Sequence, residues 1–221
     1  MAYQSKIAEA IIRRLPIYYR YLDQLESEGV ERISSRELGN RMNVTGSQFR
    51  QDISCFGGFG QQGYGYHVPT LKRHIGEILG MDRGYAAVLV GVGNMGRAIM
   101  SYDGFRKEGF RIVAAFDNDP HIVGTEMNGL TIRDFSELEP FLEEQKIDVG
   151  VICVPADNAQ MVADLLVNNG IQALWNFAPV DLHHPDTVKS TNVHLSDSLH
   201  ILTYLMNEDA LFEKKKNHSL T

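Results

Sequence analysis

Three glycines near the middle of the chain have the spacing of a phosphate-binding loop, in the segment Gly91-Val92-Gly93-Asn94-Met95-Gly96. Such a loop carries chemistry when a strand precedes it and a helix follows it, because its backbone N–H groups and the helix N-terminus then attract phosphate. The apolar run 85–90 predicts a buried strand, and 95–102 predicts the helix. The glycines would permit, in turn, a tight turn, close approach of a pyrophosphate and helix–strand packing.

An acidic residue occupies the position that ribose recognition requires. Asp117 directly follows the second expected strand, 111–116, at close to the spacing of about 20 residues that the dinucleotide fingerprint asks for. Its carboxylate can accept both adenosine ribose hydroxyls and would repel a 2′-phosphate, and the next residue is Asn118 rather than arginine. These residues predict NAD(H) rather than NADP(H). The plainer alternative is a structural glycine turn followed by a surface aspartate.

Two later strand ends are candidates for the nicotinamide half of such a site. Open α/β sheets place their ligand crevice at the carboxyl ends of the strands. The residues that follow the expected strands 148–154 and 173–176 there are Val154, Pro155, Asn176, Ala178 and Pro179. Ordinary turn chemistry accounts for them nearly as well.

A second set of polar side chains lies in a predicted helix from Thr45 to Phe56, in which Phe49 and Ile53 can pack inward. Arginine and glutamine can make paired hydrogen bonds with guanine and adenine in the major groove, and a helix N-terminus can hold a phosphate. The expected DNA contacts are Ser34, Ser35, Thr45, Ser47, Gln48, Arg50, Gln51, Ser54, Gln61 and Tyr64. An ordinary solvated helix face is the alternative.

The elements around that helix predict a winged helix-turn-helix. Ser34 and Glu37 form a capping box for a helix to about residue 42, and a tight turn joins it to the helix that Thr45 caps. The alternating glycines and aromatics of 57–67 favour a β-ribbon as the wing. Helices are expected at 5–15, 17–28 and 70–79, with Pro16 either kinking the first or opening the second.

From residue 85 the chain alternates between strands and helices, which predicts a Rossmann-like, doubly wound parallel sheet. Further strands are expected at 130–133 and 193–195, and further helices at 136–145, 158–169 and 196–212. The last helix precedes an expected solvated tail. The fold class is therefore α/β, with domains at 1–80 and 81–195 and a C-terminal helix and tail at 196–221.

Composition limits the function classes. The net charge of −7 divides into +2 over 1–80 (ten Lys and Arg, eight Asp and Glu) and −9 over 81–221 (eleven against twenty). No apolar run reaches the roughly 18–20 residues of a membrane span, and the N-terminus lacks the apolar core of a signal peptide. Cys55 and Cys153 form no CxxC pair, so a soluble, cytoplasmic protein without a disulfide is expected.

Catalysis is not expected. Too little chain follows the dinucleotide domain to build a substrate domain, and the best-placed acid–base candidates, His183 and His184, fit a surface loop equally well. A metal site at these histidines is not expected either, because the spacing of the sequence places no third ligand beside them. Cys55 is either a thiol switch or, more commonly for such a residue, a small buried side chain. The rival functions are a small NAD-dependent oxidoreductase with an appended helical domain and a CoA- or nucleotide-binding regulatory module.

Taken together, the ordered motifs resemble the Rex family of redox-sensing transcriptional repressors along nearly the whole chain. The resemblance is carried by 7–15, Tyr18-Tyr19-Arg20, Ser34-Ser35, Phe49-Arg50-Gln51-Asp52-Ile53-Ser54-Cys55-Phe56-Gly57, Gly63-Tyr64-Gly65-Tyr66, 89–96, Phe116-Asp117, Val154-Pro155 and Asn176-Phe177-Ala178-Pro179. It implies a homodimer that represses genes of NADH-reoxidising metabolism, binds a palindromic operator and leaves it when NADH binds, while NAD⁺ competes weakly or favours the DNA-bound form. It also implies that the C-terminal helix crosses to the partner subunit.

The resemblance further implies three positions that link the domains across the dimer. Arg20 fits the first and Tyr102, also an expected cofactor contact, fits the second. The third departs from the family, because Asn192-Val193-His194 stands where Asn-Val-Asp is usual, which leaves Asp197 or His194 for that role. Gln51 stands where a lysine is common, which would alter operator preference or weaken phosphate attraction.

Overall fold

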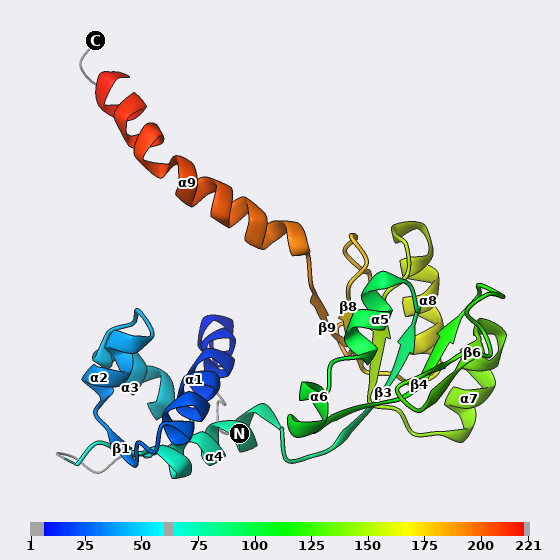
Figure 1. Ribbon diagram of the computed structural model, residues 1–221, viewed down its shortest axis with the longest axis horizontal. Helices are drawn as coiled ribbons and strands as arrows, with labels where there is room; N and C mark the ends of the chain where they lie inside the picture. The colour runs from blue at the N-terminus through cyan, green and yellow to red at the C-terminus, as the bar shows by residue number, and fades with distance from the viewer. Residues whose placement is uncertain (1–6, 60–63, 219–221) are drawn as a thin grey trace. The chain divides into compact units, whose positions relative to one another are not determined.

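The computed structural model describes residues 7–59 and 64–218, with side chains up to residue 208, and the chain divides into two compact units, Met1–Gly84 and Tyr85–Thr221 (Figure 1). Gln61, an expected DNA contact, and Ser5, an expected helix cap, lie outside the described residues.

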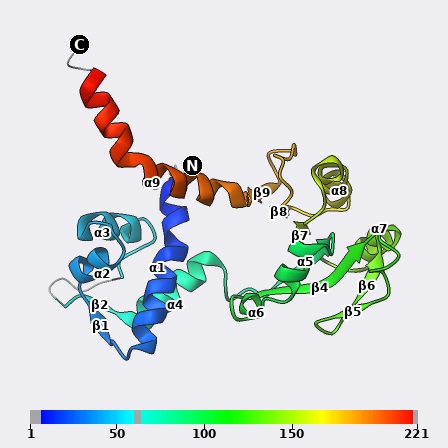
Figure 2. The ribbon, with the colours of Figure 1, turned by 45° about the horizontal axis from the view of Figure 1, so that its top comes forward.

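The first unit is a helical domain with a two-stranded ribbon. Its elements are α1 (Glu9–Ser27), β1 (Arg32–Ile33), α2 (Ser35–Arg41), α3 (Gly46–Ser54), β2 (Tyr66–His67) and α4 (Val68–Leu79). α1 packs along α4 (Figure 2). Pro16 lies inside α1, so the two helices expected at 5–15 and 17–28 are one. The reason is that the buried stripe of Leu15, Tyr18 and Leu22 continues past the exposed proline, and its burial outweighs one lost hydrogen bond.

The expected helix-turn-helix is present and capped as its sequence indicates. The Ser34 hydroxyl accepts the Glu37 N–H at 3.2 Å, and the Glu37 carboxylate accepts the Ser34 N–H at 3.0 Å. The Thr45 hydroxyl accepts the N–H of Gln48 at 3.0 Å, which caps α3. The turn between α2 and α3 is tight, because a Cβ on Gly39 would lie 2.6 Å from the Val44 carbonyl oxygen.

The ribbon differs from the one expected. Of the described residues of 57–67, only Tyr66 and His67 form a strand, and their antiparallel partner is β1, which precedes the helix-turn-helix. Among the described residues, the strand of this segment therefore pairs with β1 and not with another part of the segment. Gly65 permits this pairing: it has φ +69°, and a Cβ there would lie 2.6 Å from the Ile33 carbonyl oxygen.

The second unit is the expected doubly wound sheet. Its elements are β3 (Tyr85–Val90), α5 (Asn94–Met100), α6 (Gly104–Lys107), β4 (Phe110–Asp117), β5 (Glu126–Met127), β6 (Leu130–Asp134), the 3-10 turn Phe135–Glu137, α7 (Leu138–Glu144), β7 (Val149–Ile152), α8 (Ala156–Asn168), β8 (Ala173–Asn176), β9 (Lys189–Asn192) and α9 (Leu195–His218). The strand order is β5-β6-β4-β3-β7-β8-β9, parallel except for the β5–β6 pair. Successive strands leave β3 in both directions, so a topological switch point lies between β3 and β7.

Helices cover both faces of this sheet (Figure 1). On one face Val88, Val90 and Phe116 pack with the buried side chains of α7 and α8. On the other face Leu89 and Ala115 pack with those of α5. Because both faces are covered, the central strands are continuous apolar runs, which made them visible in the sequence.

The C-terminal part differs from expectation in two places. The last strand is β9 at Lys189–Asn192 rather than 193–195, because it is a polar edge strand with no apolar run to mark it. α9 extends to His218, through the segment expected to be a solvated tail. Among its residues with described side chains, the large apolar ones are exposed: Leu195, Leu199, Ile201, Leu202, Tyr204, Leu205 and Met206. Over residues 7–59 and 64–218, no helix combines the length and the hydropathy needed to cross a membrane.

Candidate nucleotide crevice and nucleic-acid interface

The glycine loop lies at the switch point, where the carboxyl ends of β3 and β7 meet. A Cβ on Gly91 would lie 2.7 Å from the Cys153 carbonyl group, and one on Gly96 would lie 2.0 Å from the Gly91 oxygen, so packing alone requires both glycines. Gly93 is different, because nothing lies within 4 Å of a Cβ built there. Its lack of a side chain leaves open space in front of the loop, as an approaching pyrophosphate needs.

Asp117 at the end of β4 holds this loop directly. Its carboxylate accepts the N–H of Val92 at 2.6 Å through Oδ2 and the N–H of Asp119 at 2.9 Å through Oδ1. A carboxylate has about four acceptor positions. Two backbone donors therefore leave acceptor capacity on Asp117, which lines the adjoining cavity.

That cavity, of about 430 Å³, brings part of the predicted cofactor site together. The predicted residues that line it are Gly91, Gly93, Asp117, Asn118, Val154 and Pro155. Its other lining residues were not predicted, and they are Val90, Asp119, Ile122, Phe135, Cys153, Asn158, Met161 and Val162. Ile122 lies in a loop and Phe135 begins a 3-10 turn, both without periodicity, and only the folded sheet brings them to the same cavity as Asn118.

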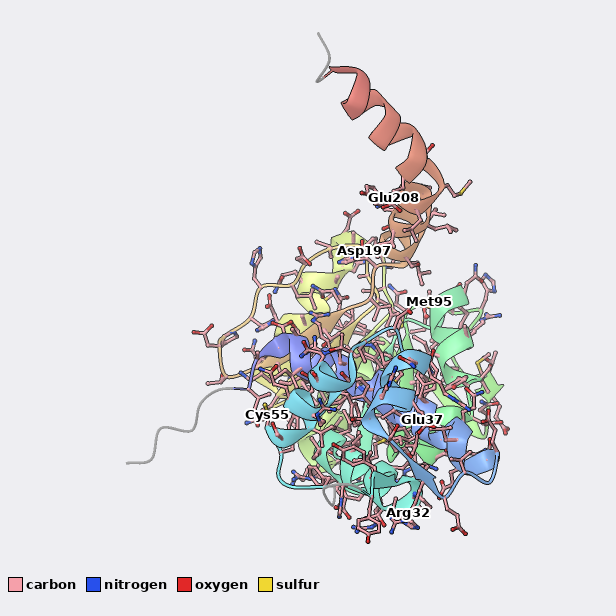
Figure 3. The ribbon with its side chains drawn as sticks, turned by 90° about the vertical axis from the view of Figure 1, so that its left-hand side faces the viewer. Arg32, Glu37, Cys55, Met95, Asp197 and Glu208 are labelled. Carbon is pink, nitrogen blue, oxygen red and sulfur yellow. The ribbon has the colours of Figure 1, made fainter. Side chains whose placement is uncertain are left out.

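Other predicted cofactor residues do not line this cavity. Val92 is buried, and Asn94, Met95 and Gly96 begin α5, where Figure 3 labels Met95. Tyr102 is exposed and lines a separate cavity of about 210 Å³.

Asn176 is buried and holds the turn after β8, donating to the Val180 carbonyl at 2.7 Å and accepting the Ala178 N–H at 3.0 Å. Pro179 stands in the same turn, so the geometry of this segment matches the turn alternative.

The two cysteines differ from each other in environment. Burial raises the pKa of the Cys153 thiol to about 12, so this group in the cavity wall stays protonated at neutral pH. Cys55, expected to be buried, is exposed just after the end of α3 (Figure 3). It follows the last turn of a short helix whose buried face is complete with Phe49 and Ile53, so the core has no place for it.

The histidines of the β8–β9 loop serve that loop. The His183 backbone N–H donates to Gln160 at 2.9 Å, and the His184 ring lies 2.7 Å from the Ser190 hydroxyl.

α3 presents four of the ten expected DNA contacts on one exposed face. Ser47, Arg50, Gln51 and Ser54 are exposed, and so is Tyr64 beside the ribbon. The Arg50 guanidinium donates to the Ser35 hydroxyl at 2.6 Å and to the Ser47 hydroxyl at 3.0 Å. These bonds hold an arginine across the two helices of the helix-turn-helix.

The sequence reasoning missed a buried ionic group beneath that face. Asp52 of α3 is fully buried, and its carboxylate accepts from Arg14 through both guanidinium contacts, at 2.6 and 2.8 Å, and from the Tyr18 hydroxyl at 2.6 Å. Gln48 also donates to it, at 2.7 Å. Burial by itself would raise the pKa of Asp52, but these hydrogen bonds outweigh it and keep the pKa below its usual range. The available signal was an aspartate three residues after Phe49, on the apolar face.

The residues expected to link the domains lie in different units: Arg20 is in the first, and Tyr102, His194 and Asp197 are in the second. Arg20 on α1 and Asp197 in the first turn of α9 (Figure 3) are both exposed. His194 lies 3.6 Å from the Asp181 carboxylate, at the root of α9. Their role between domains stays a prediction.

Comparison with known proteins gives matches to both units. A family model described as a putative DNA-binding protein N-terminus matches residues 6–54, and a model of the CoA binding domain matches residues 82–180. The redox-sensing transcriptional repressor Rex of Clostridium beijerinckii is 54% identical over 94% of this chain and 99% of its own length. That of Thermoanaerobacter pseudethanolicus is 48% identical over 99% of this chain and 98% of its own.

Two solved structures match the whole architecture. The crystal structure of RSP with beta-NAD⁺ and operator DNA has a TM-score of 0.90 at 49% identity, covering 96% of this chain and 98% of that one. The complex of RSP with beta-NADH has a TM-score of 0.89 at 46% identity, covering 95% and 99%. One fold thus accommodates both coenzyme forms and DNA in a similar protein.

Proposed function

The chain belongs to the Rex family of redox-sensing transcriptional repressors, and from that premise we propose that it binds operator DNA through its first unit and releases it when NADH binds to its second. The observation that carries this proposal is the switch-point cavity, where open space at Gly93 adjoins the carboxylate of Asp117.

The residues present fit a dinucleotide. The pyrophosphate would lie against the backbone N–H groups around Gly93, and the adenosine ribose hydroxyls would donate to Asp117, with the adenine beside Ile122 and Phe135. Val154 and Pro155 lie toward the nicotinamide end. Asn118 carries no positive charge to hold a 2′-phosphate, which supports NADH and NAD⁺ over their phosphorylated forms.

In this proposal the DNA is bound by α3, by the residues before its N-terminus and by Tyr64 beside the ribbon. Ser34, Ser35, Thr45, Ser47, Gln48, Arg50, Gln51, Ser54 and Tyr64 are the proposed contacts. The exposed apolar side of α9 supports a homodimer in which this helix packs on, and crosses to, the partner subunit. A two-fold dimer binds a palindrome when its recognition helices are spaced about one helical turn of DNA or a multiple apart.

The switch is an allosteric coupling between coenzyme and DNA. A coupling of about 1–3 kcal/mol changes operator affinity about 5- to 150-fold, and reciprocity requires DNA to weaken NADH binding by the same factor. The domain-linking roles of Arg20, Tyr102 and either Asp197 or His194 belong to this proposal.

The chain acts as a regulator and not as an enzyme, and it works in the cytoplasm, where the chromosome is accessible. Support comes from the cavity wall, where burial keeps the Cys153 thiol protonated, so it is not a ready nucleophile or base. Steady NADH consumption with any of a panel of carbonyl substrates would favour the oxidoreductase instead.

An electrophoretic mobility shift titration tests the function. The probe is a duplex selected by the full-length chain from a randomised library, titrated with NADH, NAD⁺ and CoA in parallel. We expect NADH to release the duplex at the lowest concentration and CoA to leave the complex intact. A complex that survives saturating NADH contradicts the proposal, and release by CoA alone would assign the second unit to CoA.

A further inference from the structure

One side chain of the recognition helix is fixed in orientation before any DNA arrives. Gln48 is the third residue of α3, in the N-terminal part that contacts bases in helix-turn-helix proteins, and it is half-buried at the edge of the exposed face. Its Nε2 donates to Asp52 Oδ1 at 2.7 Å. The inference below rests on the proposed function, because it concerns how the first unit recognises operator DNA.

The chemistry of Asp52 decides which end of the Gln48 amide faces it. An ionised carboxylate only accepts hydrogen bonds, so the amide NH₂ group must face Asp52, and the reversed amide would bring two oxygens together. Arg14 keeps this carboxylate ionised through two hydrogen bonds, and Tyr18 adds a third donor. The orientation therefore follows from donors and acceptors rather than from the similar shapes of oxygen and nitrogen.

The orientation leaves a defined group for DNA. With one N–H given to Asp52, the amide of Gln48 retains Oε1 as an acceptor and the second N–H beside it. In the major groove, adenine offers N6–H and cytosine N4–H to an acceptor, whereas guanine O6 and thymine O4 are themselves acceptors. Only adenine can pair with both groups of the amide at once, because it offers N6–H to Oε1 and N7 to the second N–H.

We propose that Asp52 positions Gln48 to recognise an amino-bearing base, adenine first and cytosine second, at one position of each operator half-site. Gln51 provides the contrast within the same helix. It is exposed, and among the hydrogen bonds of the described residues its side-chain amide takes no part. A free amide can turn either end to a base, so Gln51 contributes affinity with less base preference.

The experiment compares full-length wild type with Gln48→Ala. Each selects duplexes from the same randomised library, and Kd values are then measured for the wild-type consensus with every half-site base pair replaced in turn. For the wild type we expect one position to favour adenine or cytosine over guanine or thymine by about 5- to 150-fold. Gln48→Ala should lose the preference at that position and keep it at the others.

Gln51→Ala is the matched control, the same truncation on the same helix. It should lower affinity for all duplexes while keeping the adenine or cytosine preference that Gln48→Ala removes. The inference is overturned if Gln48→Ala retains every base preference, or if the position it loses favours guanine or thymine. If the wild-type chain selects no duplex at all, the proposed function itself fails and this inference with it.

Discussion

The buried carboxylate under the recognition helix offers a sharp stability test, through Asp52→Ala. The substitution removes the hydrogen-bond acceptor of two groups on α1. These are the Tyr18 hydroxyl, whose residue is 1% exposed, and the Arg14 guanidinium, whose side chain is 27% exposed. It also frees the Gln48 amide, which can reach water from its half-buried place.

The size of the loss in stability depends on how well water can replace the lost hydrogen bonds of each group. An unpaired buried hydroxyl costs about 1–3 kcal/mol, and breaking a fully buried ion pair costs about 3–5 kcal/mol. Because Arg14 is partly exposed, its loss falls at the lower end of that range. We therefore expect Asp52→Ala to lower the free energy of unfolding of the first unit by about 4 kcal/mol, about 3 from the ion pair and about 1 from the hydroxyl. Tyr18→Phe on top of Asp52→Ala should recover about 1 kcal/mol.

Urea denaturation separates this effect from any change in the second unit. Far-ultraviolet circular dichroism follows both units, whereas the single tryptophan, Trp175, lies in β8 and follows the second alone. In Asp52→Ala the unfolding transition of the first unit should move to lower urea, and the transition reported by Trp175 should not move. Arg13→Ala is the control, because Arg13 and Glu9 form an ion pair on the same helix with side chains 75% and 74% exposed, expected to be worth less than about 0.5 kcal/mol. If Asp52→Ala costs no more than Arg13→Ala, the reasoning about burial is wrong.

Four further outcomes are expected. Asp117→Ala should weaken NADH binding about tenfold or more, measured by calorimetry, and leave a repressor that stays on DNA; release at wild-type NADH concentrations would remove Asp117 from the site. Arg50→Ala should weaken operator binding in mobility shifts while NADH affinity stays unchanged; equal loss of both would point to misfolding. Leu202→Asp, on the exposed side of α9, should shift the chain from dimer to monomer in sedimentation velocity; an unaffected dimer would place the interface elsewhere. Since the pKa of folded Asp52 lies below its unfolded value near 4, its stabilisation is complete above about pH 4 and is lost as pH falls through the folded pKa; the urea midpoint of the first unit should drop with acid more steeply in the wild type than in Asp52→Asn.

The elements that the sequence predicted correctly are those whose signals are local. The apolar run of β3 and the capping box of Ser34 and Glu37 each depend on neighbours in the chain, and both are present at those residues. The same holds for the glycine loop, since the clash that a Cβ on Gly96 would make involves Gly91, within the same motif.

The features that escaped prediction depend on distant partners. Asp52 is hydrogen-bonded to Arg14, 38 residues away, and the residues around either one in the sequence do not indicate this pairing. β9 is polar and is a strand only because β8 provides an edge to pair with. The partner of β2 is likewise distant, since Tyr66 pairs with Ile33, so the glycine-rich segment alone could not identify it. At Pro16 the local signal itself was misleading. Proline usually ends or kinks a helix, but α1 continues because its buried apolar side chains lie on both sides of the proline in the sequence.

The division of labour inside the second unit limits where redox sensing can occur. In the proposed binding mode Gly93 and Asp117 would face the pyrophosphate and the adenosine ribose, which are identical in NADH and NAD⁺, so neither residue could distinguish the two forms. The coenzymes differ only in the charge and planarity of the nicotinamide ring. In that binding mode the segment of the cavity wall from Cys153 to Pro155, after β7, would lie toward the ring, and burial keeps its one titratable group, the Cys153 thiol, neutral. An uncharged wall offers the NAD⁺ ring no counter-charge for its desolvation, so this end of the crevice favours the neutral ring of NADH. The preference for the reduced form thus follows from what the wall lacks rather than from a specific contact.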